Sequence, residues 1–245
     1  MSKLSLFNKN LTTLEGINFP EDLIELDISL NRLTSLKHCP PNIKILYCSL
    51  NYLTSLEYCP QNLEKLDCSL SYLTSLQYCP HHLQELNCNS NQLTSLEYCP
   101  LNIKELNCSN NQLNSLQYCP PHLQKLNCSD NQLTSLYYCS QNLQKLNCSY
   151  NQLTSLQYCP ENLQKLYCYH NPLDQQYKNK TINKINQINS IKYFQLGLTK
   201  INNLILNHKV SIIQRCWKDY WYKPNDNNES KIGLYYYQQY MNEIN

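Results

Sequence analysis

Hydrophobic residues recur along most of this chain with a fixed period of 20 residues. With Leu83 taken as position 1, the unit 83–102 reads LQELNCNSNQLTSLEYCPLN and has leucine at positions 1, 4, 11 and 14. The same register runs from Leu23 to Leu173, which gives eight full or nearly full units. A fixed period of this length is typical of repeat architectures, in which each unit buries its apolar face against its neighbours. The pattern therefore predicts a solenoid.

Positions 3 to 7 of each unit alternate between polar and apolar side chains, as in Glu85 to Asn89. This alternation predicts a short strand with one buried face, so side chains 4 and 6 are expected to point inward and side chains 3, 5 and 7 outward. Because one such strand cannot bury its apolar face alone, we expect the strands to stack as a parallel sheet. A 20-residue coil leaves no room for a full helix on the opposite face, where extended or turn segments are expected.

Position 9 follows the strand and is asparagine in every unit except one, where Ser71 replaces it. An amide that carries both donors and acceptors can satisfy backbone groups that a turn leaves unpaired. Proline at position 18 of six units suits an extended connection to the next strand. The asparagines of position 9 are Asn31, Asn51, Asn91, Asn111, Asn131, Asn151 and Asn171.

The pattern LxxLxCxxNxLxxLxxCPxxL of residues 23–173 resembles the leucine-rich repeat family, in particular its shortest, bacterial-effector-like class. In that class the unit ends LPxLPxxL, whereas the corresponding residues here are Leu96-Glu97-Tyr98-Cys99-Pro100. The cysteine-containing repeats are also similar to those of giant DNA viruses. The resemblance implies a leucine-rich repeat solenoid with parallel strands on the concave face and extended or turn segments on the convex face. It also implies a non-catalytic protein-protein interaction scaffold.

The repeats divide the chain into three segments: an irregular first repeat and N-terminal cap at 1–22, eight repeats at 23–173, and a basic tail or cap at 174–245. The third segment carries 10 Lys and Arg against 5 Asp and Glu. Isoleucine at every third residue from Ile182 to Ile191 indicates amphipathic helix. We expect two or three helices there, forming a helical C-terminal cap over the core of the last repeat.

Composition and charge exclude several classes of function. The chain has 245 residues, a formal net charge of +2 and only 3 Gly, which argues against a general nucleic-acid-binding protein and against a phosphate-binding glycine loop. No apolar run approaches the roughly 18 to 20 residues of a membrane span, and the first residues lack the apolar stretch of a signal peptide. We therefore expect an intracellular, cytoplasmic protein, in the host cytoplasm if it is viral, without a membrane partner.

Fourteen of the 15 cysteines fall in two rows, at positions 6 and 17 of the repeat. Their spacings alternate between 9 and 11 residues, unlike the short Cys-x2-Cys pairs that converge on a metal ion. Free cysteine is among the most buried residue types. We interpret both rows as reduced core residues, and we expect no metal site and no cofactor.

Outward positions are where a partner would be recognised, and the first three repeats are the most apolar there. Residues at positions 3, 5, 8 and 10 of these units are expected to form one patch, and exposed patches of this kind mark interfaces. The alternative is that residues 1–22 fold over the patch as a cap. The predicted partner-binding residues are Leu30, Ile45, Tyr47, Leu50, Tyr52, Leu70 and Tyr72.

Two further sets of aromatic residues follow the repeat register. Tyr150, Tyr167, Tyr169 and His170 form a group that we expect a docked C-terminal segment to use. A row at position 16 is expected to stack on the convex side as part of the structure. It comprises Tyr58, Tyr78, Tyr98, Tyr118, Tyr138 and Tyr158.

Residues 213–223 resemble the IQ motif that calmodulin-like proteins bind. The apolar, glutamine and basic positions match, whereas Asp219 replaces the usual glycine and Pro224 would end the helix. A basic amphipathic helix is a typical calmodulin target, so an adapter that binds a calmodulin-like protein is an alternative function. The matching residues include Ile213, Gln214, Lys218 and Lys223.

Cys216 is the one cysteine out of register. Effectors that share this repeat class carry a separate domain in which a cysteine transfers ubiquitin, so a cysteine-dependent transferase is a second alternative. Only 72 residues follow Leu173, too few for that domain. We therefore expect Cys216 to be a core residue of the cap and the chain not to be an enzyme.

Overall fold

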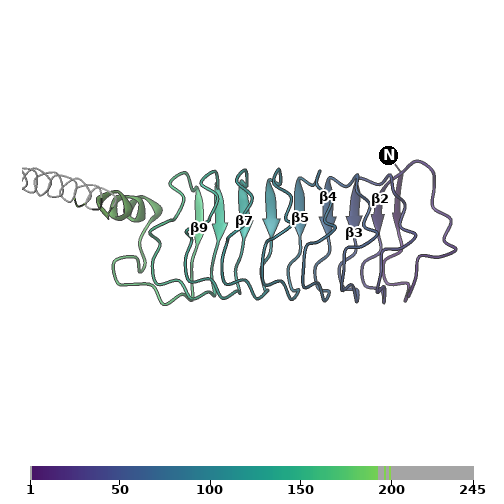
Figure 1. The fold of residues 1–245 in the computed structure, drawn as a ribbon, viewed down its shortest axis with the longest axis horizontal. Coiled ribbons are helices and arrows are strands. Elements are labelled where there is room, and N and C mark those ends of the chain that lie inside the picture. Colours follow the sequence, from purple (N-terminus) through teal and green to yellow (C-terminus); the bar gives the residue numbers. More distant parts are fainter. Residues whose placement is uncertain (1, 193–195, 197–198, 200–245) are drawn as a thin grey trace, which may run out of the picture. The chain divides into compact units, whose positions relative to one another are not determined.

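The computed structural model of the protein describes residues 2–192, 196 and 199. Nine short strands, one for each coil, form a single parallel sheet in sequence order (Figure 1). The strands are β1 (Ser2–Ser5), β2 (Leu23–Asp27), β3 (Ile45–Tyr47), β4 (Lys65–Asp67), β5 (Glu85–Asn87), β6 (Glu105–Asn107), β7 (Lys125–Asn127), β8 (Lys145–Asn147) and β9 (Lys165–Tyr167).

The 20-residue period sets the register of the sheet. From β2 onward each residue pairs with the residue of the same repeat position in the next coil, as Leu46 pairs with Leu66. The first coil contributes β1, in which Leu4 pairs with Leu26 across 22 residues. Residues 2–22 are therefore one more coil of the solenoid, and the two extra residues are accommodated in its loop.

The strands end earlier than the alternating pattern indicates, at position 5 and not 7, and from β3 onward they span only positions 3 to 5. The chain turns at position 8, where Leu50 has a φ of 56°. Position 7, expected to face outward, is mostly buried: Ser69 is only 4% exposed. Its N–H and hydroxyl both hydrogen-bond to the carboxylate of Asp67, at 3.0 and 2.6 Å. This local turn ends the in-and-out alternation of the strand.

One continuous core runs through the coils. The leucines and isoleucines of positions 1, 4, 11 and 14 are almost all fully buried, as are the cysteines of position 6 from Cys48 to Cys148. Each buried leucine stabilises the fold by about 1.5 to 3 kcal/mol relative to an exposed one. Because every coil contributes the same set, each packs on the next as one layer of a shared core.

The asparagines of position 9 join successive coils. Asn51 donates from Nδ2 to the carbonyl oxygens of Ile28 and Cys48, both at 3.0 Å, and its Oδ1 accepts from the N–H of Leu33 at 2.9 Å. The other six asparagines make the same kind of bridge. Ser71 interrupts the series, since its hydroxyl is buried without a hydrogen-bond partner in the part of the chain that the structure describes. The predicted backbone-satisfying role of position 9 is confirmed.

The interpretation of the two cysteine rows as core residues is confirmed for most of their members. The 14 cysteines are free thiols, and 11 of them are buried. Most thiols of position 6 donate to a carbonyl of the next coil, as Cys48 does to Asp67 at 3.2 Å. Burial raises the pKa of Cys39 to about 12 and that of Cys119 to about 11. These thiols are therefore protonated at neutral pH.

The C-terminal side of the last repeat is covered by a helix. Residues 182–192 are helical, and Tyr177 and Ile185 are each 1% exposed. Asn189 donates to the carbonyl oxygen of Leu156 at 2.9 Å and accepts from the Tyr177 hydroxyl at 3.1 Å. The predicted helical C-terminal cap is confirmed. Any second or third helix of residues 200–245 lies outside the described residues.

None of the helical residues that the structure describes forms a segment of the length and apolarity that crossing a membrane requires.

Candidate protein-binding surfaces

Five large apolar side chains that are exposed on the first three repeats form a ridge. It follows positions 8 and 10, on the segment that leaves each strand, and the parallel register places its members on neighbouring coils. The side chains are between 38 and 49% exposed, and the rings of Tyr52 and Tyr72 lie 6.1 Å apart. We call this set the apolar ridge: Leu30, Leu50, Leu70, Tyr52 and Tyr72.

The backbone directs the ridge leucines outward whatever the side chain is. Leu30, Leu50 and Leu70 have φ values of 53° to 56°, as does Asp130 at the same position of a later coil. The N–H of Leu50 donates to the carbonyl oxygen of Ser69 at 3.0 Å, which holds this turn against the next coil. A positive φ costs a residue other than glycine roughly 1 to 2 kcal/mol, and asparagine or aspartate tolerates it better than leucine. Leucine at this position is therefore not required by the turn.

The other two predicted residues, Ile45 and Tyr47, lie on β3 and are half-buried. Tyr47 lines a groove of about 520 Å³ along the strands, together with Lys65 and Asp67. The structure thus divides the predicted patch into the apolar ridge and a part of the concave face.

Residues 2–22 do not cover the apolar ridge. They form a coil of their own, whose strand pairs with the edge of β2. Leu30, Leu50 and Leu70 stay 38, 42 and 46% exposed with this coil in place. The alternative that the N-terminal segment folds over the leucines is therefore wrong for the residues described.

Phe7 is an exposed residue that the repeat analysis missed, with 48% of its surface accessible. It lies just before Asn8, whose N–H donates to the carbonyl oxygen of Ser29 at 3.1 Å. Because Leu4 is equivalent to Leu26, Phe7 is equivalent to Ser29 at position 7, which the alternating pattern predicts to face outward. The repeat register could therefore have identified Phe7 as an exposed residue. The apolar surface therefore begins in the first coil.

The concave face carries a row of charges at position 3. Lys3 pairs with Glu25 and Lys65 with Glu85, each at 2.7 Å, and Lys125 pairs with Glu105. Lys145 and Lys165 have no acidic partner among residues 2–192. Exposed pairs of this kind contribute about 0 to 1 kcal/mol each to stability, so they matter more for the choice of partner.

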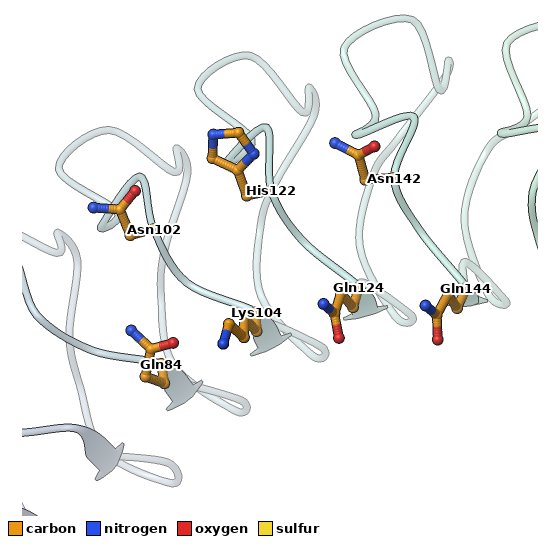
Figure 2. A pocket seen from close by; sticks show the side chains of 7 residues that line it. All are labelled: Gln84, Asn102, Lys104, His122, Gln124, Asn142 and Gln144. Atoms are coloured by element: carbon orange, nitrogen blue, oxygen red, sulfur yellow. The ribbon is translucent and has the colours of Figure 1, made fainter.

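A second groove lies where the chain enters the strands. It has a volume of about 720 Å³ and is lined by positions 20 and 2 of successive coils. Figure 2 shows these side chains repeating from coil to coil, most of them amides. The surface offers hydrogen-bond donors and acceptors without a nucleophile beside a base. Its lining residues are Gln84, Asn102, Lys104, His122, Gln124, Asn142 and Gln144.

The aromatic group of the last repeats is exposed. Tyr150 and His170 stack with ring centroids 4.2 Å apart, and the ring centroids of Tyr167 and Tyr169 are 6.3 Å apart. Tyr150, Tyr167 and Tyr169 are 46 to 65% exposed. Residues 174–192 cap the core and leave these rings accessible. The described part of the tail therefore does not dock on the aromatic group as expected.

The tyrosines of position 16 also differ from expectation. From Tyr58 to Tyr138 they are 52 to 56% exposed. The rings of Tyr138 and Tyr158 pack edge-on against Tyr137, with centroids 4.8 and 4.9 Å apart, and Tyr158 also packs against the core. The prediction that this row stacks on the convex side as part of the structure is therefore confirmed for Tyr138 and Tyr158 and wrong for the four tyrosines before them. The residues that bear on catalysis or calmodulin-like binding, Cys216 and Ile213, Gln214, Lys218 and Lys223, lie outside the described residues.

Within residues 2–192, no group of three or more His, Cys, Asp or Glu side chains converges to hold a metal ion. The cysteine thiols of the two rows are mostly buried.

Solved structures identify the class of this fold. The chain is similar to YopM from Yersinia enterocolitica, with 30% identity over 63% of this chain and 43% of that one and a TM-score of 0.51. It is similar to an internalin from Listeria monocytogenes, with 18% identity over 71% and 56% of the two chains and a TM-score of 0.61. A Shigella effector leucine-rich repeat domain matches at 26% identity over 68% and 81%, with a TM-score of 0.57.

The protein is a leucine-rich repeat solenoid, and its 20-residue spacing is that of the short bacterial-effector-type class. Neighbours of this fold indicate a protein-interaction scaffold. No protein-family model matches the chain, and neither does any curated protein. The chain spans 43% of YopM and 56% of the internalin.

Proposed function

We propose that this protein is a non-catalytic scaffold that binds a partner protein through the apolar ridge and the adjoining residues Ile45 and Tyr47 of β3. The observation that carries the proposal is the exposure of Leu30, Leu50 and Leu70 at a turn where leucine is unfavourable. Apolar side chains exposed on three successive coils do not stabilise the isolated protein. They contribute favourable free energy only when a partner removes them from water.

Composition along position 8 supports this location. The ridge has leucine in three consecutive coils, whereas the next three coils have Ser90, Asn110 and Asp130 in the same backbone conformation. The fold therefore accepts polar residues at this position. Tyrosine is favoured at interfaces, which suits Tyr52 and Tyr72 to act as anchors beside the leucines.

The test is the double substitution Leu50→Asp and Leu70→Asp in the full chain. Since Asp130 occupies the equivalent turn, the fold should tolerate aspartate, and we expect an unchanged circular dichroism spectrum and a melting temperature within a few degrees of the original. Two buried charges would oppose binding, so the Kd for a purified partner should rise by about a hundredfold. Isothermal titration measures it.

The matched control is Ser90→Asp with Asn110→Asp, which adds the same two charges at the same repeat position outside the ridge. Partners are first captured from cytosol on the wild-type chain, and the one selected is then purified and titrated. A partner that binds all three proteins equally well would contradict the proposal. Calcium-dependent binding that ignores both double variants would instead favour residues 213–223.

A further inference from the structure

Four tyrosines at position 16 share an unfavourable backbone conformation. Tyr58, Tyr78, Tyr98 and Tyr118 have φ values of 65° to 69°. Each is the third residue of a turn closed by a hydrogen bond from the cysteine N–H to a leucine carbonyl oxygen, at 2.9 Å from Cys59 to Leu56. Such turns favour glycine or asparagine at this place, because other side chains are strained there. We call these four residues the tyrosine row.

The side chains of the tyrosine row make few packing contacts with the solenoid, although their backbone conformation is strained. The four side chains are 53 to 56% exposed, and their rings contact no other aromatic ring in the described part of the chain. Tyr138 has no positive φ and packs edge-on against Tyr137 at 4.8 Å. Strain that the core does not require, repeated in four coils, indicates a binding role for the exposed rings.

The charged residues directly before the four tyrosines are acidic, while Lys37 holds the equivalent position before His38 in the preceding coil. Glu57 and Glu97 precede Tyr58 and Tyr98, both are exposed, and neither takes part in an ion pair among residues 2–192. Gln77 precedes Tyr78 in the coil between them. Glu57 also accepts a hydrogen bond from the Tyr58 hydroxyl. This part of the surface therefore favours a cationic ligand and disfavours a nucleic acid, whose phosphates it would repel.

We propose that the tyrosine row docks a proline-rich segment in the polyproline II conformation that carries basic residues. Aromatic side chains that recur once in each coil can pack against the proline rings of such a segment. Their hydroxyls can donate to the backbone carbonyls of a polyproline II helix, which makes no internal hydrogen bonds. Because such a segment is already extended, it loses little conformational entropy on binding. Glu57 and Glu97 would select the arginines or lysines of the ligand.

This surface is distinct from the apolar ridge, since it lies at position 16 of the coil whereas the ridge lies at positions 8 and 10. The probe is a fluorescent synthetic peptide of repeated Pro-Pro-Arg triplets, titrated against the full chain by fluorescence anisotropy. We expect saturable binding to the wild-type protein. We expect little binding of a Gly-Gly-Arg peptide, which has the charge without the stiffness, or of a Pro-Pro-Glu peptide.

The decisive variant is Tyr78→Asn with Tyr98→Asn. Asparagine suits a positive φ, so the melting temperature should stay the same or rise, while the Kd for the Pro-Pro-Arg peptide should increase by about tenfold or more. The matched control is Tyr150→Asn with Tyr169→Asn, which removes two tyrosines that are 52 and 65% exposed elsewhere on the repeats and should leave the Kd unchanged.

Four results would overturn the proposal. The first is no binding of the Pro-Pro-Arg peptide to the wild-type chain, and the second is equal binding by the Tyr78 and Tyr98 variant. A marked fall in the melting temperature of that variant would show that the tyrosines serve the fold instead. Binding of a single-stranded oligonucleotide in place of the peptide counts against the proposal as well.

Discussion

The side chain of position 9 decides how firmly two coils are joined. In seven coils an asparagine satisfies backbone groups of two units at once, with Asn91 accepting from the N–H of Leu73 at 2.9 Å and donating to the carbonyl of Cys68 at 3.0 Å. At Ser71 the side chain is too short for this bridge, and its hydroxyl is buried without a partner. A buried polar group left unpaired costs about 1 to 3 kcal/mol.

We therefore predict that Ser71→Asn raises the free energy of unfolding by about 1 to 2 kcal/mol, because it restores the bridge between the second and third repeats. Urea denaturation followed by circular dichroism measures the change. The reverse substitution, Asn91→Ser, is the control and should lower the free energy of unfolding by a similar amount. An unchanged midpoint for Ser71→Asn would show that the position cannot accept the amide.

At the scale of elements, the two ends of the sheet are covered by different structures. Coil 2–22 adds its own strand to β2, while the last coil is closed by Tyr177 and helix 182–192. Both hide a layer of core that would otherwise face water, which terminal repeats of a solenoid must do. Ile185 lies at the centre of the C-terminal contact and is 1% exposed.

Ile185→Asp should detach the helix, because a buried carboxylate without a partner is strongly unfavourable. We expect the last two repeats to fray, with faster amide hydrogen exchange in residues 143–173 and a loss of about 2 to 4 kcal/mol in the free energy of unfolding. Ile191→Asp is the matched control, since Ile191 is 58% exposed. Equal exchange rates in both variants would contradict the assigned role of Ile185.

At the scale of the whole molecule, the two cysteine rows couple stability to pH. Burial raises the pKa of the thiols of both rows above the ordinary value of 9.0. The unfolded chain loses these protons above about pH 9, whereas the folded chain keeps them. The stability contributed by each thiol is therefore present below the unfolded pKa and is lost as pH rises toward the folded pKa.

We predict steep alkaline unfolding. Each buried thiol lowers the free energy of unfolding by about 1.4 kcal/mol per pH unit above pH 9, and the contributions of the two rows add. Thermal melts between pH 7 and pH 11 should show a constant melting temperature up to about pH 8.5 and a sharp decline beyond it. A chain with Cys→Val at Cys88, Cys108 and Cys128 should decline less steeply. An identical decline in that variant would contradict the mechanism.

The repeat register was readable from the sequence because each coil obeys local rules that its neighbours repeat. Leu26 and its counterparts mark the buried face of every strand, and Asn51 and its counterparts mark each turn, so strand order, core and the class of fold follow without knowledge of the tertiary structure. The helical cap was likewise indicated by the spacing of Ile182, Ile185 and Ile188. These features depend on residues a few positions apart or one period apart.

Exposure and backbone strain were decided only by the tertiary structure. The sequence shows that Leu50 and Tyr78 recur in register, but only the stacking of coils shows that Leu50 stays uncovered beside coil 2–22 and that Tyr78 sits at a positive φ without ring contacts. The alternation that predicts an outward Ser69 fails for the same reason, because the turn at position 8 bends the chain after three strand residues. A periodic pattern determines which residues are equivalent, whereas their surroundings depend on where the neighbouring coils end.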